Sequence, residues 1–283
     1  MKFRKPVALV TGASSGIGKA TSERLAAAGY NVYGTSRRPA SPGVQPFEML
    51  SLDVTSDESV ETAVNTLLQS AGRIDLLVNN AGFSVAPAGA EESSIEQARA
   101  IFDTNFFGII RMTRAVVPHM RRQGGGQIIN IGSVLGFLPA PYMALYAATK
   151  HALAGYSESL DHELRTRGIR VTVIEPAFTK THFEANLLEP DAALDEYREA
   201  RAGVTRQLRA ALETADEPGV VADVVLEAAS AARPRLRYTA GGLANRLGLL
   251  RRFAPARLVD AGIRKDLRLD APGASPRTAT VPA

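Results

Sequence analysis

The feature that most constrains the fold is a glycine-rich turn between a short apolar run and a helix-like stretch. The apolar run Ala8 to Val10 precedes the turn Thr11-Gly-Ala-Ser-Ser-Gly-Ile-Gly18, and the helix-like stretch Lys19 to Ala28 follows it. Gly12 and Gly16 allow positive φ and a close approach of the backbone to a ligand. The first N–H groups of such a helix have no partner within the helix and can bind a pyrophosphate. The segment therefore predicts a strand, a turn and a helix that cradle a dinucleotide.

Further apolar runs alternate with helical stretches along the rest of the chain. The expected strands after the first are Val32 to Thr35, Glu48 to Leu52, Leu76 to Asn79, Ile128 to Ile131, Val171 to Glu175 and Leu236 to Thr239. This alternation requires crossover connections, and hence a mostly parallel sheet covered by helices on both faces. We predict an α/β chain with a single-domain, Rossmann-type, doubly wound sheet of about seven strands, for which 283 residues is an ordinary length.

A tyrosine and a lysine one helical turn apart point to acid–base chemistry. Tyr146 and Lys150 are spaced as Y-A-A-T-K, and Ser133 lies upstream of them, just after an expected strand. A free phenol titrates near ~10, and a cation at position i+4 favours the phenolate. The Ser133 hydroxyl could hold a substrate oxygen, or it could bond its own loop backbone. This set predicts an enzyme.

The order of the motifs resembles that of the short-chain dehydrogenase/reductase family. The shared features are T-G-x-x-x-G-x-G, Asn79-Asn-Ala-Gly82, an Asn within Asp103-Thr-Asn-Phe-Phe-Gly108, and Ser133 followed by Y-x-x-x-K, over residues 5 to 240. The resemblance implies a catalytic tetrad of Asn105, Ser133, Tyr146 and Lys150, with Asn105 kinking its helix and holding a water. It also implies nucleotide contacts from Gly12, Ser14, Ser15, Gly16, Ile17, Gly18, Asp53, Val54, Asn80, Ala81, Gly82, Tyr146, Lys150, Pro176 and Thr179.

Cofactor choice is indicated by the end of the second expected strand, which reads Asn31-Val-Tyr-Gly-Thr-Ser-Arg-Arg38. No carboxylate is present there to bind the ribose hydroxyls of NAD. Thr35, Ser36 and Arg37 instead offer hydrogen bonds and a guanidinium suited to a 2′-phosphate. We therefore favour NADP(H) over NAD(H), although the two arginines could also form a solvated basic turn.

The substrate region is rich in apolar side chains. Apolar residues near the expected substrate loops are Phe83, Val85, Leu135, Phe137, Leu138, Tyr142, Phe178 and Phe183. They predict a pocket for a bulky hydrophobic secondary alcohol or its ketone or aldehyde, in which Ser133, Leu135, Tyr142, Tyr146 and Phe178 contact the substrate. Core packing explains some of them equally well. Residues 179–206 lie where family members carry a mobile substrate lid, and this segment resembles that of steroid- and retinoid-dehydrogenase-like members.

One position departs from the family pattern. The family commonly has Pro-Gly after its sixth strand, whereas this chain has Pro176-Ala177, with Thr179 retained. The backbone at Ala177 must then accommodate a Cβ atom, and Thr179 can still meet the nicotinamide amide.

Composition excludes several classes of site. The chain contains no cysteine and only four scattered histidines, so disulfides and thiolate metal sites are excluded, and we expect no metal. The N-terminus passes directly into the first strand and leaves no room for a signal peptide, which favours a cytoplasmic protein.

The C-terminal part is strongly basic. From Arg233 onward there are 11 Lys/Arg and 3 Asp residues, and leucines alternate with arginines around Pro255. We expect a catalytic domain over residues 1–240, a basic amphipathic helical extension over 241–270 and a disordered tail over 271–283. The extension could form a subunit contact or a lid, or attach the protein peripherally to a membrane. Nucleic-acid binding is the least favoured use.

Other functions and assemblies remain open at this level. A non-catalytic nucleotide-sensing regulatory protein could keep the glycine turn, but it would not need the tetrad. An epimerase or dehydratase of the same fold would need further acid–base groups, for which Glu175 and His182 are the available candidates. The expected helices over residues 96–122 and 145–167 suit the interface of a homodimer or homotetramer. The expected substrate is a small-molecule alcohol or carbonyl compound.

Overall fold

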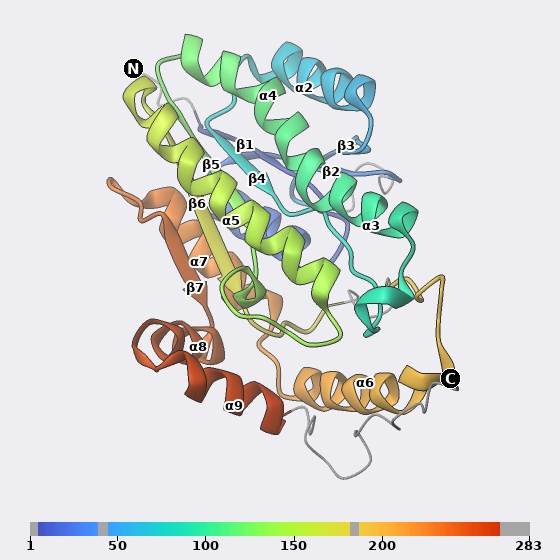
Figure 1. Ribbon diagram of the computed structural model, residues 1–283. Helices are drawn as coiled ribbons and strands as arrows, with labels where there is room; N and C mark the ends of the chain where they lie inside the picture. Colours follow the sequence, from blue (N-terminus) through green and yellow to red (C-terminus); the bar gives the residue numbers. More distant parts are fainter. Residues whose placement is uncertain (1–4, 39–44, 182–186, 267–283) are drawn as a thin grey trace, which may run out of the picture.

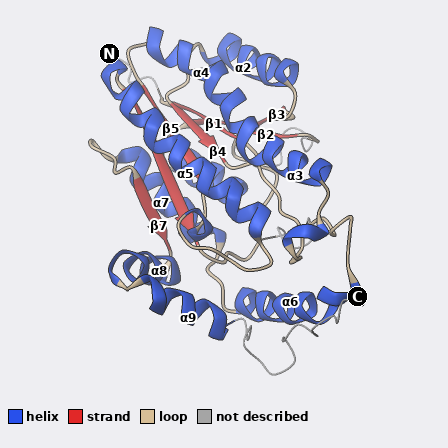
Figure 2. Cartoon of the chain, viewed as in Figure 1, coloured by secondary structure: helices blue, strands red, loops and turns tan. Residues whose placement is uncertain are grey.

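The computed structural model describes residues 5–38, 45–181 and 187–266 and contains a seven-stranded parallel sheet between two layers of helices (Figures 1 and 2). Each strand falls within two residues of the run predicted for it. The strands are β1 (Val7–Val10), β2 (Asn31–Ser36), β3 (Glu48–Ser51), β4 (Leu76–Asn79), β5 (Gly126–Ile131), β6 (Ile169–Pro176) and β7 (Arg237–Ala240).

The strand order is β3-β2-β1-β4-β5-β6-β7, and all six neighbouring pairs are parallel. The chain runs outward from β1 to β3 and then returns to the other side of β1 to form β4. All carboxyl ends therefore meet at one edge of the sheet. The loops diverge between β1 and β4, which is where ligands bind in doubly wound sheets.

Helices cover both faces of the sheet (Figure 1). Side chains of α2, α4 and α5 pack on one face, and those of α1 and α7 pack on the other. The helices are α1 (Gly16–Ala27), α2 (Asp57–Ala71), α3 (Ile95–Phe102), α4 (Gly108–Arg122), α5 (Ala144–Leu164), α6 (Arg198–Glu213), α7 (Pro218–Ser230), α8 (Gly242–Phe253) and α9 (Ala256–Asp266).

Burial on both faces explains why the strands are apolar without alternation. In β1, Val7 and Leu9 belong to the core beneath α2 and α4, whereas Ala8 and Val10 belong to the core beneath α1 and α7. All four side chains are buried. Successive residues of a strand point to opposite faces, so a strand covered on both sides must be apolar at every position.

Local sequence sets several helix boundaries. The Ser56 hydroxyl accepts a hydrogen bond from the Ser59 N–H at the start of α2, and Gly72 ends that helix with φ of 74°. The Ser94 hydroxyl caps α3 in the same way through Gln97 N–H. These are ordinary serine N-caps and a left-handed glycine C-cap.

The C-terminal helices α8 and α9 lie in the segment expected to be basic and amphipathic, and they break near Pro255. α8 starts two residues after β7 and packs against the loop that follows β5. The predicted disordered tail, residues 271–283, lies outside the described residues, as do residues 182–186 of the predicted lid. We find no helix in the described part of the chain with the length and apolar character needed to span a bilayer.

A buried carboxylate fastens α5 to β6. Asp161 on α5 is fully buried, forms ion pairs with Arg165 and Arg170, and accepts a hydrogen bond of 2.8 Å from Val171 N–H. Burial alone would raise the pKa of Asp161, but the hydrogen bonds from Arg170, Val171 and Arg165 outweigh it and hold the pKa below its ordinary value. Because α5 carries Tyr146 and Lys150, this contact helps to fix the position of both.

Asp161→Asn is expected to lower the free energy of unfolding near neutral pH by about 2–3 kcal/mol, because charge-assisted hydrogen bonds to two arginines are lost. The folded-state pKa lies below the unfolded-state value, so the wild-type advantage is present above the unfolded-state value and disappears as pH falls through the folded-state value. Urea unfolding at several pH values measures both effects. Glu163→Gln, an exposed acid on the same helix, serves as the control and should change stability by less than ~0.5 kcal/mol. Equal effects of the two substitutions would contradict this role for Asp161.

Candidate active site

The glycine turn between β1 and α1 has the conformation that its sequence predicts. Gly12 and Gly16 have φ of 66° and 54°, which side-chain-bearing residues rarely adopt. A Cβ atom on Gly18 would lie 2.2 Å from the Gly12 carbonyl oxygen. The turn therefore requires glycine at these positions for backbone reasons.

The N-N-A-G segment after β4 holds this turn in place. The Thr11 hydroxyl accepts hydrogen bonds from the N–H groups of Asn80 and Ala81, at 2.9 and 3.0 Å. In return, the Asn80 amide donates to the carbonyl oxygens of Thr11 and Gly12, at 3.0 and 3.1 Å. Asn80 thus ties the ends of β1 and β4 together, a positioning role that the sequence motif alone did not specify.

The start of α1 fits a nucleotide diphosphate. Ser15 occupies the N-cap position, but its side chain does not cap the helix, so the first N–H groups remain available for an anion. A hollow of about 640 Å³ lies beside this turn and is lined in part by Gly16, Lys19 and Lys180. Ser14, Ser15 and Ile17 lie in the same turn, at the carboxyl edge of the sheet. The backbone shape suits a bound pyrophosphate, whereas Lys19 and Lys180 are ion-paired with Glu23 and Glu217, which also line the hollow.

The end of β2 lies beside the loop after β3. Thr35 is buried, and Ser36 forms a small turn with the backbone of Arg38. Arg37 is exposed and close enough to Asp53 to influence its titration. The pKa of Asp53 is lowered, mainly by hydrogen bonds from Thr55 and to a smaller extent by the charge of Arg37. The positive charge of Arg37 therefore lies close to Asp53, the residue that is predicted to contact the adenine.

Val54 is buried beneath the start of α4. A Cβ atom on Gly108 would lie 2.9 Å from a Val54 methyl carbon, so glycine is needed at that helix start for close packing. Asp53 and Val54 thus lie in the loop that follows β3, and their contacts with the adenine stay a prediction.

The structure brings Ser133, Tyr146 and Lys150 together at the carboxyl edge of the sheet. Ser133 follows β5 and is largely buried, and its side chain is hydrogen-bonded to the Tyr146 hydroxyl. The Ser133 oxygen also accepts a 3.1 Å hydrogen bond from Leu135 N–H. The hydroxyl therefore bonds to its own loop backbone as well as to Tyr146. Burial raises the pKa of Tyr146, and the hydrogen bond with Ser133 opposes part of that rise. In the protein without nucleotide, Tyr146 is therefore a protonated phenol at neutral pH.

Lys150 lies under the Tyr146 ring as a buried cation. Its Nζ is 5.4 Å from the ring centroid and donates a 2.9 Å hydrogen bond to the Ile131 carbonyl oxygen at the end of β5. Within the described residues, no carboxylate forms an ion pair with Lys150. Burial lowers the pKa of Lys150 to about 8. The ammonium group therefore has donors left for ligand hydroxyls, and it titrates close to neutral pH.

Asn105 lies in a π-helical turn, Asp103–Phe107, between α3 and α4. The family resemblance implied that Asn105 kinks its helix, and a π-helical turn is one of the features that commonly kink a helix. The Asn105 side chain accepts from Phe83 N–H at 3.0 Å and donates to Phe83 C=O at 2.8 Å, and it reaches the Thr149 hydroxyl at 3.4 Å. It therefore links the loop after β4 to the helix that carries Lys150. A role in holding a water remains a prediction.

The predicted substrate residues divide into two groups. Leu135 and Tyr142 are partly exposed near Tyr146, and Phe178 is 40% exposed after β6. Val85 and Leu138 are buried, which fits the alternative that they serve in core packing; their place in a substrate pocket stays a prediction. Phe183 lies outside the described residues.

Tyr142 has a strained backbone. Its φ is 64°, the only positive value for a non-glycine residue in the described chain. Its carbonyl oxygen accepts a 2.9 Å hydrogen bond from Ala88 N–H, and its ring meets that of Tyr197 edge-on at 6.4 Å. Backbone strain of this kind is common in functional loops. Here the contacts with Ala88 and Tyr197 hold Tyr142 between the tetrad and the lid segment.

The departure at Ala177 causes no strain. Pro176 ends β6, Ala177 has no positive φ, and Thr179 is largely buried. The Thr179 backbone forms a bridge with Asp216, and the hydroxyl lies 3.4 Å from the Ala177 carbonyl oxygen. A Cβ at residue 177 is therefore accommodated.

A buried ion pair that the sequence analysis missed holds the lid segment. Glu92 is fully buried, pairs with Arg201 on α6, and accepts hydrogen bonds from the N–H groups of Gly89 and Leu194 at 2.6 and 2.8 Å. A short backbone bridge between Val85 and Leu188 adds to it. These contacts join positions about a hundred residues apart, and local sequence carries no signal of such pairing.

The two further acid–base candidates, Glu175 and His182, gain no support from the structure. Glu175 is buried and pairs with Arg237, which also pairs with Glu158, so this acid serves to join β6 to β7. This arrangement does not favour Glu175 as an additional acid–base group, and His182 lies outside the described residues. The described residues contain no cluster of His, Asp or Glu that could hold a metal.

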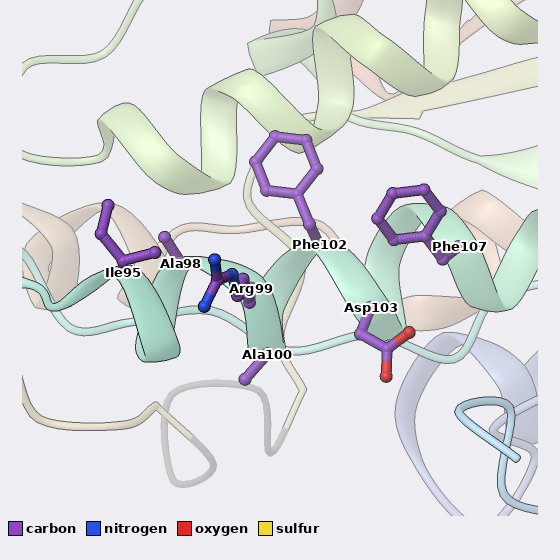
Figure 3. A pocket seen from close by; sticks show the side chains of 7 residues that line it. All are labelled: Ile95, Ala98, Arg99, Ala100, Phe102, Asp103 and Phe107. Carbon is purple, nitrogen blue, oxygen red and sulfur yellow. The ribbon is translucent and has the colours of Figure 1, made fainter.

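An apolar depression of about 480 Å³ lies along α3 and the π-helical turn (Figure 3). Ile95 and Phe107 line it and are 64% and 47% exposed. It contains none of the predicted catalytic residues, and it belongs to the outer helical face rather than to the candidate active site.

Comparisons with known proteins agree with this architecture. The family model described as short chain dehydrogenase matches residues 6–192. The chain is 42% identical over 180 residues to 3-ketodihydrosphingosine reductase from Bacteroides thetaiotaomicron, an alignment that covers 64% of this chain and 66% of that protein. It is 34% identical over 253 residues to retinol dehydrogenase 8 from Bos taurus, covering 81% of this chain and 79% of that one.

A solved structure extends the likeness to almost the whole fold. The crystal structure of a short-chain dehydrogenase from Streptomyces avermitilis matches with a TM-score of 0.79 and 34% identity, covering 95% of this chain and 98% of that chain. With the family match over well above half of the sequence, the chain belongs to the short-chain dehydrogenase/reductase family of NAD(P)-dependent oxidoreductases.

Proposed function

We propose that this protein is an NADP(H)-dependent oxidoreductase that interconverts a bulky hydrophobic alcohol and its carbonyl compound, a secondary alcohol giving a ketone and a primary alcohol an aldehyde, with Tyr146 as the acid–base group. The observation that carries the proposal is the contact set of Tyr146. Its hydroxyl bonds to Ser133, and the buried Lys150 ammonium lies 5.4 Å from its ring. A proton donor and a second hydroxyl thus converge at the edge of the sheet that carries the glycine turn.

Each residue has a distinct part in the proposed reaction. Ser133 holds the substrate oxygen, and Tyr146 donates a proton to it in reduction or removes one in oxidation. Lys150 stabilises the phenolate that forms when Tyr146 loses its proton. Asn105 fixes the helix that carries Lys150 through its contacts with Phe83 and Thr149. The nicotinamide nucleotide, when bound, supplies or accepts the hydride.

The remaining site residues are assigned to nucleotide binding. The glycine turn and the start of α1 hold the pyrophosphate, and Lys150 holds the nicotinamide ribose. Thr35, Ser36 and Arg37 hold the 2′-phosphate of NADP(H), a role supported by the absence of an acid at the end of β2 and by the exposed guanidinium of Arg37. Asp53 and Val54 contact the adenine, and Pro176 and Thr179 contact the nicotinamide.

A bulky apolar substrate is supported by the side chains around the site and by the relatives. Leu135, Tyr142 and Phe178 offer apolar surface beside the tetrad. Two relatives are named for 3-ketodihydrosphingosine and retinol, both hydrophobic molecules with an oxygen function that a hydride transfer converts. The Glu92–Arg201 pair keeps the lid segment beside this surface, so the substrate enters between the lid and the loop after β5.

A homodimer or homotetramer is proposed through the outer faces of α3, α4 and α5. Ile95 and Phe107 expose large apolar side chains there, in the depression shown in Figure 3. Contact between copies across this face would bury both side chains.

Tyr146→Phe is expected to lower kcat for carbonyl reduction by about 10²–10⁴, because the proton donor is removed. Nucleotide affinity should change little. NADPH consumption followed with a panel of bulky ketones measures the rate, and fluorescence titration measures binding. Tyr156→Phe, another hydroxyl removal on α5, is the control and should remain active. Turnover by Tyr146→Phe at the wild-type rate would rule out Tyr146 as the acid.

Arg37→Ala is expected to lower kcat/KM for NADPH by about ten-fold or more while leaving kcat/KM for NADH nearly unchanged, because a charge-assisted contact to the 2′-phosphate is worth ~1.5–3 kcal/mol. Arg38→Ala removes a neighbouring exposed guanidinium and should have the smaller effect. A wild-type preference for NADH would contradict the assignment.

The pH dependence should report Lys150. Since the pKa of Lys150 is about 8 in the protein without nucleotide, kcat/KM for NADPH is expected to be highest below that value and to fall as pH rises through it. Below about 8 the ammonium is charged and can bind ribose hydroxyls, and above it the charge is lost. In Lys150→Arg the fall should disappear, because arginine keeps its charge. A wild-type profile that stays flat through this pH range would contradict the role of Lys150.

A further inference from the structure

The two C-terminal helices, α8 and α9, both expose large apolar and basic side chains. Leu249, Leu250 and Phe253 on α8 are 61%, 47% and 72% exposed, and Leu258 on α9 is 60% exposed. We call these four residues, with the exposed basic side chains among them, the C-terminal basic face. Its basic members are Arg246, Arg252, Arg257 and Lys265. Only a few side chains anchor the two helices, chiefly the buried Ala244 and Val259.

This face lies at the carboxyl edge of the sheet, beside the candidate active site. α8 packs on the turn Val134–Gly136 that directly follows Ser133. The Arg251 guanidinium Nε donates a 3.0 Å hydrogen bond to the Phe137 carbonyl oxygen in the same loop. Figure 1 shows α8 and α9 at the same end of the molecule as α6, the helix that follows the lid segment. A surface bound to the C-terminal basic face would therefore lie close to the substrate loop.

The charge and the apolar side chains of the C-terminal basic face indicate what kind of partner it binds. Over residues 242–266 there are six basic and two acidic residues, so the partner must carry negative charge. The exposed leucines and phenylalanine require apolar surroundings as well, which a nucleic acid backbone does not provide. Basic and apolar side chains together on helices too short to span a bilayer are typical of helices that lie in the interface of an anionic membrane.

Two other occupants fit less well. A second copy docked through a twofold axis would bring the same basic face against itself, and like charges would oppose each other. The remaining chain, residues 267–283, carries Arg268, Arg277 and one acid, Asp270, so it cannot neutralise the face. An anionic lipid surface meets both the charge and the apolar requirement.

We propose that the C-terminal basic face docks the protein on the surface of an anionic lipid membrane, with the substrate loop turned toward the lipid. The apolar side chains enter the boundary between headgroups and acyl chains, while the arginines and lysine contact the acidic headgroups. The substrate-delivery part of this inference rests on the proposed function, but the docking itself does not. An apolar alcohol or ketone dissolved in the bilayer would then reach the site without crossing water.

The full-length protein is mixed with vesicles of phosphatidylcholine alone or of phosphatidylcholine with phosphatidylserine, and co-sedimentation is measured at low and at moderate salt. Wild type is expected to sediment with the phosphatidylserine vesicles at low salt and to be released as salt rises. Arg252→Glu/Arg257→Glu should weaken binding by at least ~25-fold, since each cation near such a surface contributes about five-fold. Phe253→Ser should weaken it as well, with less dependence on salt.

A matched control lies on a distant helix. Arg121→Glu removes an exposed arginine at the end of α4 and should not affect vesicle binding. Circular dichroism confirms that each variant is folded. Sedimentation does not depend on turnover. A protein that fails in the ketone assay but binds vesicles would therefore contradict the proposed function and still support the docking proposal.

Three outcomes would overturn the proposal. Wild type that stays in the supernatant with phosphatidylserine vesicles at low salt would overturn it directly. Loss of an oligomer in Phe253→Ser, seen by light scattering without any vesicle binding by wild type, would assign the face to a second copy. Salt-sensitive binding to DNA in the absence of vesicle binding would assign it to nucleic acid.

Discussion

Parallel pairing of all seven strands is the constraint on which the site depends. It brings the carboxyl ends of the strands to one edge, so that residues from distant parts of the sequence become neighbours. Thr11 after β1 and Asn80 after β4 are 69 positions apart, and they meet through a 2.9 Å hydrogen bond. Ile131 at the end of β5 meets Lys150 in the same way at 2.9 Å. The geometry of the candidate active site therefore follows from the sheet before any ligand contributes.

Burial of Lys150, with no carboxylate paired to it among the residues that the structure describes, is the main electrostatic feature of the site. A buried ammonium is normally costly unless it is paired, and here a carbonyl oxygen and the face of an aromatic ring provide only partial compensation. That cost appears as the lowered pKa of Lys150. Such a site gains from any ligand that offers further hydrogen-bond acceptors, which supports the two roles proposed for Lys150, in nucleotide binding and in stabilising a phenolate.

Much of the fold could be predicted because the signals are local. The apolar runs and the glycine turn specify strands and a crossover without reference to distant residues, and each observed strand lies within two residues of its prediction. The grouping of Ser133, Tyr146 and Lys150 was predictable from motif order. Ala177, an apparent departure, proves harmless because its backbone has no positive φ.

Other features could not be predicted because they depend on contacts between distant segments. Glu92 and Arg201 lie 109 positions apart, and nothing in the sequence around either residue marks it as buried or paired. The family resemblance implied a kink at Asn105, but the π-helical turn and the contacts of Asn105 with Phe83 and Thr149 were not predictable from the sequence. The sequence also could not separate Val85, which packs inside, from Phe178, which is exposed.

The most direct test of the central claim is a crystal structure of the protein with NADP⁺ and the best alcohol from a substrate panel. The account predicts that the alcohol oxygen lies within ~2.6–3.2 Å of both the Tyr146 and Ser133 hydroxyls, and that Lys150 bonds to the nicotinamide ribose. An alcohol oxygen held by other groups, with Tyr146 turned away from it, would contradict the account.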